Sequence, residues 1–170
     1  DTFGYENSFM VTSASVSLPK SPLNYEEKLS VAIAHGIPEE KFIYEKVPYA
    51  WKTWKNIPSI LAQRGLSLDN VILVYVVGKK DMDEDPRFVP GFTKKGSPTY
   101  FQHYSPDIIL KPGSVHGYLV VAPHVEFALP NGEESSGTNL RSFLATASPE
   151  MFEAAMGFYD PQIDVMLKQK

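Results

Sequence analysis

The chain has 170 residues, of which 43% are hydrophobic and 21% charged, and its formal net charge is −4. This composition is that of an ordinary globular protein, and we predict a single domain over residues 1–170, N-terminally incomplete. The weak negative charge and the lack of cysteine exclude a global field for nucleic acid, a disulfide framework and thiolate metal sites. Since no apolar run approaches the roughly 20 residues that span a bilayer, we expect a soluble protein without a membrane partner. The lack of cysteine fits a reducing interior, so we expect a cytoplasmic location.

The first part of the chain predicts a strand, a helix and a second strand. Residues 9–12 form a β-rich run. Asn24 and Glu27 have the spacing of a capping box, so a helix is expected to follow Asn24. Gly36 can end that helix, because glycine adopts the left-handed conformation common after a last turn. Residues 41–45 then predict a short strand.

The middle of the chain contains the best strand candidate. Residues 53–64 predict a helix that is interrupted by Pro58. Residues 71–77 are an unbroken apolar run, which is typical of a strand buried on both faces in a parallel sheet. We therefore expect this strand to be central. Residues 79–106 are charged and contain glycine and proline, so they predict a long loop.

The last part of the chain predicts one more strand and three helices. Residues 118–121 are apolar, and helix starts follow near Thr138, Ser148 and Asp160. The latter two precede a proline, which suits the first helical position. Strands that alternate with helices predict an α/β fold, a Rossmann-like doubly wound parallel sheet with helices on both faces, in which ligands bind at the carboxyl ends of the strands.

Arg141 has an unexpected position in the first of the three C-terminal helices, the one that starts near Thr138. If that helix starts at Thr138, Arg141 takes the position where glutamate or glutamine usually closes a capping box. A cation there opposes the helix dipole, but a phosphate held by helix N–H groups, by the hydroxyls of Ser136 and Thr138 and by the guanidinium would reverse that cost. The alternative is that Arg141 points into water or pairs with Glu133 or Glu134.

Three segments deserve comparison with known families: residues 22–28, residues 76–78 with Asp81, and residues 136–141. Together they resemble the nucleotidyltransferase superfamily that includes pantetheine-phosphate, nicotinamide-mononucleotide and cytidylyl transferases. Residues 136–141 resemble its S-[SG]-T-x-[ILV]-R signature, and residues 22–28 resemble the helix after its second strand. Residues 76–78 with Asp81 resemble its V-G-[ST]-D strand end. The chain from Phe9 onward can be laid along this family, most closely along compact bacteriophage members.

The resemblance implies a reaction and a set of binding residues. A nucleotidyl group passes from a nucleoside triphosphate to a small phosphate-bearing acceptor, with Mg²⁺ bridging the phosphates. Gly78 marks where the backbone approaches the nucleotide, Asp81 would position ribose or metal, and Lys28 would be a second phosphate contact. The implied nucleotide- and phosphate-binding residues are Ser136, Gly137, Thr138, Arg141, Gly78, Asp81 and Lys28.

One departure from the family concerns catalysis. Its chemistry uses an H-x-G-H motif, whose imidazoles stabilise the pentavalent phosphorus, and this motif does not occur in the sequence. By the alignment we expect it upstream of Asp1, and the catalytic residues stay unknown. His35 and Gly36 stand at a helix end, where Gly36 serves as a cap. The alternative function is that of a non-catalytic phage virion or scaffold protein, and homo-oligomer or virion assembly stays open.

Overall fold

The computed structural model describes residues 3–84, 86 and 88–170. The chain forms two compact units. The helical unit comprises residues 1–48, 52–54 and 126–170, and the sheet unit comprises residues 49–51 and 55–125. The single-domain prediction stays a prediction.

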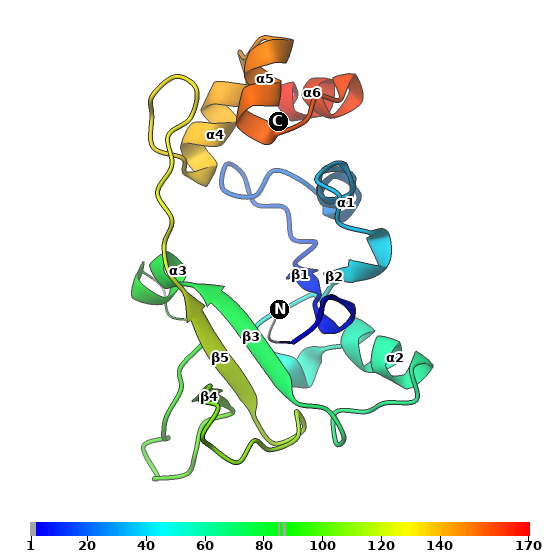
Figure 1. The fold of residues 1–170 in the computed structure, drawn as a ribbon, viewed down its shortest axis with the longest axis vertical. Coiled ribbons are helices and arrows are strands. Elements are labelled where there is room, and N and C mark those ends of the chain that lie inside the picture. The colour runs from blue at the N-terminus through cyan, green and yellow to red at the C-terminus, as the bar shows by residue number, and fades with distance from the viewer. Residues whose placement is uncertain (1–2, 85, 87) are drawn as a thin grey trace. The chain divides into compact units, whose positions relative to one another are not determined.

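The α/β class with parallel strands is confirmed. In the helical unit β1 (Met10–Thr12) pairs in parallel with β2 (Phe42–Tyr44). In the sheet unit three parallel strands lie in the order β3 (Leu73–Gly78), β5 (Gly117–Ala122) and β4 (Phe101–His103) (Figure 1). Parallel strands need crossover connections, and α1 lies in the one from β1 to β2, as in Rossmann-like folds.

Helix α1 (Tyr25–Ala34) begins as its sequence predicts. Asn24 Oδ1 accepts from the backbone N–H of Glu27 at 3.0 Å, and Glu27 Oε2 accepts from the N–H of Asn24 at 2.9 Å. The capping box is therefore complete. Gly36 follows the helix with φ of +81°, a conformation that other residues rarely adopt.

Two faces of α1 pack against different parts of the helical unit. Leu29 and Ala32 are buried together with Phe42 of β2, while Val31 and Ala34 pack against a cluster formed by the C-terminal helices. In addition, the hydroxyl of Tyr25 donates to the carbonyl of Phe42 at 3.0 Å. Helix α1 thus joins the β1–β2 sheet to the C-terminal helices.

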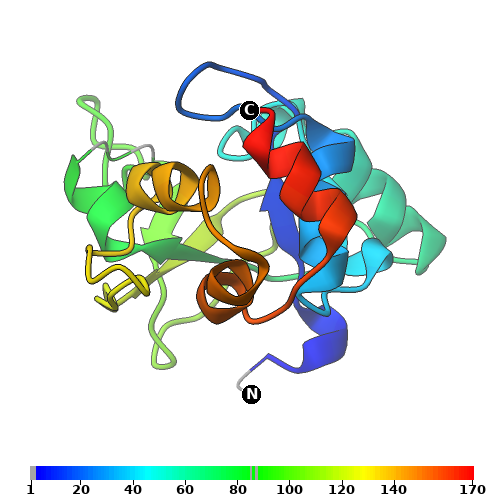
Figure 2. The same cartoon turned by 90° about the horizontal axis from the view of Figure 1, so that it is seen from above.

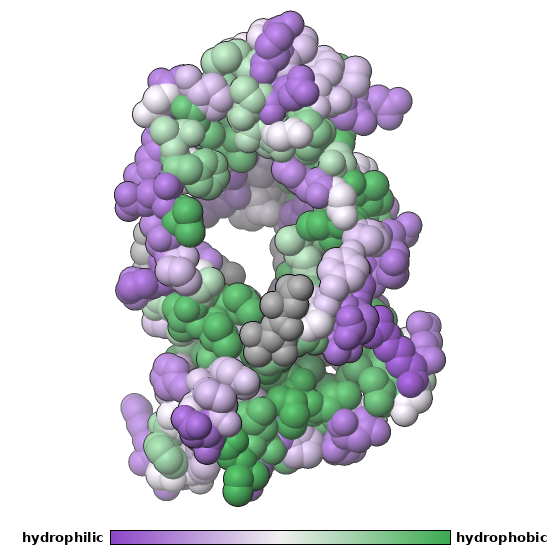
Figure 3. All heavy atoms as spheres, viewed as in Figure 1, coloured by the Kyte–Doolittle hydropathy of each residue, from purple (hydrophilic) through white to green (hydrophobic). Residues whose placement is uncertain are grey.

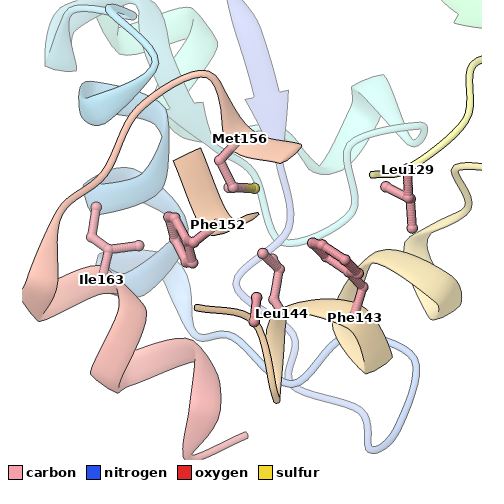
Figure 4. Close-up of a cluster of buried hydrophobic side chains, with 7 residues drawn as sticks. Leu129, Phe143, Leu144, Phe152, Met156 and Ile163 are labelled. Carbon is pink, nitrogen blue, oxygen red and sulfur yellow. The ribbon is translucent and has the colours of Figure 1, made fainter. Parts of the chain in front are cut away.

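Three C-terminal helices form the main core of the helical unit. They are α4 (Gly137–Leu144), α5 (Pro149–Met156) and α6 (Pro161–Lys168), and α6 lies beside α1 (Figures 1 and 2). Ser148 and Asp160 accept hydrogen bonds from the first-turn N–H groups of α5 and α6, as predicted. Their buried side chains meet around the ring of Phe152 (Figure 4), and the buried cluster comprises Leu129, Phe143, Leu144, Ala147, Phe152, Met156 and Ile163.

An ion pair ties the end of the chain to α1. Lys170 Nζ lies 2.7 Å from Glu27 Oε1. The Lys170 ammonium and, after it, the backbone N–H of Asn24 lower the pKa of Glu27 from its usual 4.5. A carboxylate with a lowered pKa stabilises the folded state above its unfolded pKa, and this stabilisation disappears as the pH falls through the folded pKa.

Glu27→Gln is expected to lower the free energy of unfolding by about 0.5 kcal/mol at neutral pH, because glutamine keeps a capping side chain but loses the ion pair. The difference from wild type should shrink once the pH falls below the normal glutamate pKa of 4.5 and vanish below the lowered pKa of the folded state. Urea denaturation across this pH range measures it. A difference that grows on acidification would contradict the assignment.

In the sheet unit, the predicted central position of residues 71–77 is wrong. The central strand is β5, whose Tyr118 and Leu119 are each 2% exposed, and β3 lies at one end of the sheet. Val76 of β3 is 65% exposed, so burial on both faces is not found either, and apolar surface is visible on this unit (Figure 3).

The reason for the error lies in the segment that was predicted to be a loop. Residues 79–106 contain α3 (Lys79–Glu84) and β4, and β4 pairs with β5 on the side away from β3. Because β4 has three residues, it carries no periodic pattern that could identify it. Its pairing with a distant strand decides which strand is central.

Helix α2 (Asn56–Gln63) begins later than predicted, and this accommodates its proline. Lys55 is the N-cap, so Pro58 falls in the first turn. The N–H groups of a first turn have no intrahelical partner, and a proline there removes no hydrogen bond. Three 3₁₀ turns complete the secondary structure of the described residues: η1 (Tyr5–Asn7), η2 (Glu39–Lys41) and η3 (Trp51–Thr53).

Candidate functional site

Helix α4 begins with Ser136 as its cap. Ser136 Oγ accepts from the backbone N–H of Asn139 at 3.1 Å, and the helix runs over Gly137–Leu144. The helix therefore begins earlier than the predicted start near Thr138. With Ser136 as the cap, the residue at the position where a capping box has Glu or Gln is Asn139. Its side-chain amide donates to the carbonyl of Glu134 at 2.9 Å. Arg141 does not occupy the capping-box position that the sequence suggested.

The guanidinium of Arg141 nevertheless lies beside the first turn. Its Nη2 donates to Thr138 Oγ1 at 3.4 Å. A Cβ atom added to Gly137 would stand 3.3 Å from Arg141 Nη1, so the guanidinium also lies close to that glycine. Side chains of a helix lean toward its N-terminus, and this tilt brings the charge of Arg141 back over the turn that precedes its own Cα.

Several hydrogen-bond donors gather at this turn. Gly137 and Thr138 are exposed and occupy the first two helical positions, where backbone N–H groups have no intrahelical acceptor. Within the described ranges no other acceptor is found for them. The Ser136 hydroxyl accepts a bond from Asn139 and keeps its own hydrogen for donation. Together with the guanidinium these groups suit an anion.

The alternative role of Arg141, an ion pair with Glu133 or Glu134, is not found. Among residues 3–84, 86 and 88–170, Arg141 forms no salt bridge, and its one described side-chain partner is Thr138. Arg141 is half-buried rather than extended into solvent. The Arg141 guanidinium is therefore positioned by a contact within its own helix, the hydrogen bond to Thr138.

Lys28 lies at the carboxyl end of β1. Its Nζ donates to the carbonyl of Ser13, the residue after β1, at 2.6 Å. An ammonium has three hydrogens, so Lys28 can bind this carbonyl and still donate to a ligand. The carboxyl end of a parallel strand is where ligands of α/β proteins bind.

Gly78 and Asp81 meet in the sheet unit. Gly78 ends β3, and Asp81 lies in the first turn of α3. A Cβ atom on Gly78 would lie 3.2 Å from Asp81 Oδ2, so the glycine leaves room for this carboxylate. A single carboxylate together with phosphates is a common Mg²⁺ environment, and a carboxylate also accepts from ribose hydroxyls. The described residues contain no group of three or more His, Asp or Glu side chains that could hold a metal.

The structure thus brings the predicted site residues together in part. Ser136, Gly137, Thr138 and Arg141 form one group at the start of α4, which we call the α4 turn. Gly78 and Asp81 form a second group in the sheet unit, and Lys28 stands in the helical unit at the end of β1.

Two histidines, His35 and His116, have contacts typical of structural residues. His35 ends α1, and the edge of its ring meets Phe158 with 4.8 Å between ring centroids. His116 Nδ1 lies 3.3 Å from the carbonyl of Tyr100. These contacts agree with the prediction that His35 and Gly36 form a helix end and not a catalytic motif.

Sequence reasoning missed a depression beside α4. It has a volume of about 350 Å³ and is lined in part by Asn131, Glu133, Ser142 and Thr146. The signal for it was the sequence Pro130-Asn131-Gly132, which is typical of a tight turn. This turn places Asn131 and Glu133 next to the helix.

None of the family models, curated proteins or solved structures compared with this chain matches it. The resemblance to nucleotidyltransferases therefore rests on the residues named above. Among the helices of the described residues, none has the length and apolar character needed to cross a bilayer.

Proposed function

We propose that the α4 turn binds the phosphates of a nucleoside triphosphate, and that the protein transfers a nucleotidyl group to a small phosphate-bearing acceptor. The proposal rests on one observation: the Arg141 guanidinium lies beside the first turn of α4, where two backbone N–H groups and two hydroxyls are available. A cation and a helix N-terminus repel each other, and an anion bound between them is attracted by both.

The chemistry of such a site is positioning and charge stabilisation. The N–H groups of Gly137 and Thr138 and the guanidinium of Arg141 would hold the β- and γ-phosphates. Lys28 would give a second phosphate contact. In the sheet unit, Asp81 beside Gly78 would offer a carboxylate to Mg²⁺. When bound, Mg²⁺ neutralises the phosphates and holds their geometry.

The transfer step also needs groups that stabilise the α-phosphate during attack. The family uses H-x-G-H imidazoles for this purpose, and these 170 residues lack that motif. The catalytic part of the proposal therefore depends on groups outside this sequence. The binding part depends only on the α4 turn and can be tested on the chain itself.

Calorimetric titration of the chain with ATP and CTP in the presence of Mg²⁺ tests binding. We expect dissociation constants below the millimolar range for at least one of them. Pyrophosphate release with phosphopantetheine or nicotinamide mononucleotide as acceptor tests transfer. If neither nucleotide binds at millimolar concentration, the proposal is wrong. If a nucleotide binds but no pyrophosphate is released, neither by this chain nor by the protein with any sequence encoded before Asp1, the non-catalytic alternative is favoured.

Gly137→Ala is expected to weaken ATP binding about fivefold, because the new methyl group stands close to Arg141 Nη1 and displaces the guanidinium from the turn. The free energy of unfolding should stay equal or rise by about 0.5 kcal/mol, since the φ of Gly137 is not positive and alanine restricts the unfolded chain. Calorimetry and thermal melts measure the two effects. In an Arg141→Ala background the same change should leave affinity unaltered, and an unchanged fivefold loss there would contradict the mechanism.

A further inference from the structure

The depression beside α4 has the composition of a sugar site. It lies between the turn that contains Asn131 and Glu133 and the segment from Ser142 of α4 through Thr146 to the start of α5, and the buried ring of Phe143 lines it too. Its volume of about 350 Å³ falls within the usual range for small-ligand sites, roughly 300–1,000 Å³.

The polar groups of this depression are available to a ligand. For the hydroxyls of Ser142 and Thr146 and the carboxylate of Glu133, the described part of the chain offers no hydrogen-bond or ion-pair partner. Asn131 Oδ1 accepts from the backbone N–H of Glu133 at 3.1 Å, which fixes the amide and leaves its hydrogens to donate.

This mixture of groups selects a class of ligand. The carboxylate only accepts hydrogen bonds, the amide hydrogens of Asn131 only donate, and the hydroxyls of Ser142 and Thr146 do both. An ammonium would leave the amide hydrogens without an acceptor, and a phosphate would meet the negative charge of Glu133. A hydroxyl group satisfies both kinds of partner, so the depression suits a polyol.

The depression adjoins the α4 turn. Ser142 follows Thr138 by four residues in the same helix, so their Cβ atoms are neighbours at about 5–6 Å. A ligand whose phosphates occupy the α4 turn can therefore extend along this face of the helix. We infer that the depression binds the ribose of the nucleotide, with the Glu133 carboxylate accepting from its 2′- and 3′-hydroxyls. This inference rests on the proposed function, since the α4 turn must hold the phosphates.

Three probes separate the sugar from the phosphates: ATP, 2′,3′-dideoxy-ATP and inorganic tripolyphosphate. We expect the wild-type chain to bind ATP about tenfold more tightly than the dideoxy analogue, the typical effect of losing hydrogen bonds to a charged group. Glu133→Gln should reduce this preference to below about threefold and leave the affinity for tripolyphosphate equal or slightly higher. Calorimetry measures each affinity.

The matched control is Glu153→Gln, which neutralises an exposed glutamate of α5 that does not line the depression. It should keep the tenfold preference. If the wild-type chain binds ATP and dideoxy-ATP equally well, the ribose assignment is wrong, while the proposed binding of phosphates at the α4 turn is unaffected. Failure of all three probes to bind would instead refute the proposed function. A preference that Glu133→Gln leaves intact would place the ribose elsewhere and overturn the inference.

Discussion

Phe152→Ala is expected to lower the free energy of unfolding by about 3–5 kcal/mol, the usual effect of removing a buried phenylalanine ring. Phe152 is 0% exposed and lies at the centre of the cluster of the three C-terminal helices. Its ring contacts those of Phe158 and Tyr159, with centroids 6.0 Å and 5.7 Å away. Alanine would leave a cavity that these helices cannot fill without moving.

Urea denaturation followed by circular dichroism measures this loss. Val165→Ala in α6 is the matched control, because Val165 is 55% exposed and its truncation should change the free energy by less than about 0.5 kcal/mol. A loss below about 1 kcal/mol for Phe152→Ala would show that the cluster is not the core of the helical unit. Since Phe143 and Leu144 of α4 belong to the cluster, the same packing holds the helix that carries the α4 turn.

Local signals in the sequence predicted the helix ends well. Asn24 and Glu27 form the expected capping box, and Ser148 and Asp160 cap the last two helices before their prolines. In each case the decisive contacts join residues within one turn, so the spacing of the residue types contains the necessary information. The same locality explains why Gly36 could be recognised as a helix end.

The order of the strands could not be predicted in this way. The apolar run of β3 indicated a strand correctly, but its place at one end of the sheet depends on the pairing of β4 with β5. That pairing joins segments distant in sequence, and the three residues of β4 carry no pattern of their own. Hydrophobicity identified the strand but contained no information about its neighbours.

The start of α4 and the place of Arg141 could be predicted only in part. Two hydroxyl residues, Ser136 and Thr138, can each cap a helix, and the sequence alone did not decide between them. The structure uses Ser136, which moves Arg141 to the second turn. The predicted nearness of the guanidinium to the helix start is nevertheless found, because the side chain leans back to Thr138. The depression at Glu133 was missed, since it depends on how a tight turn packs against α4.

Arg141→Ala is expected to weaken triphosphate binding by about 1.5–3 kcal/mol, the typical contribution of hydrogen bonds to a charged group. The free energy of unfolding should stay almost unchanged, because the side chain is half-buried and has no ion pair among the described residues. Affinity and stability should therefore respond differently to the same substitution. Titration with ATP and CTP measures the first, and thermal melts without nucleotide measure the second.

Arg141→Lys is the matched variant, since it keeps the charge and loses the planar fork that can bind two phosphate oxygens. We expect it to recover part of the affinity, and we expect the affinity of both wild type and Arg141→Lys to fall with added salt, as charge pairing requires. If Arg141→Ala instead lowers the melting temperature by several degrees and leaves ATP affinity unchanged, Arg141 stabilises α4 and binds no phosphate. The α4 turn would then lose its cation, and the remaining N–H groups alone would not support a triphosphate site.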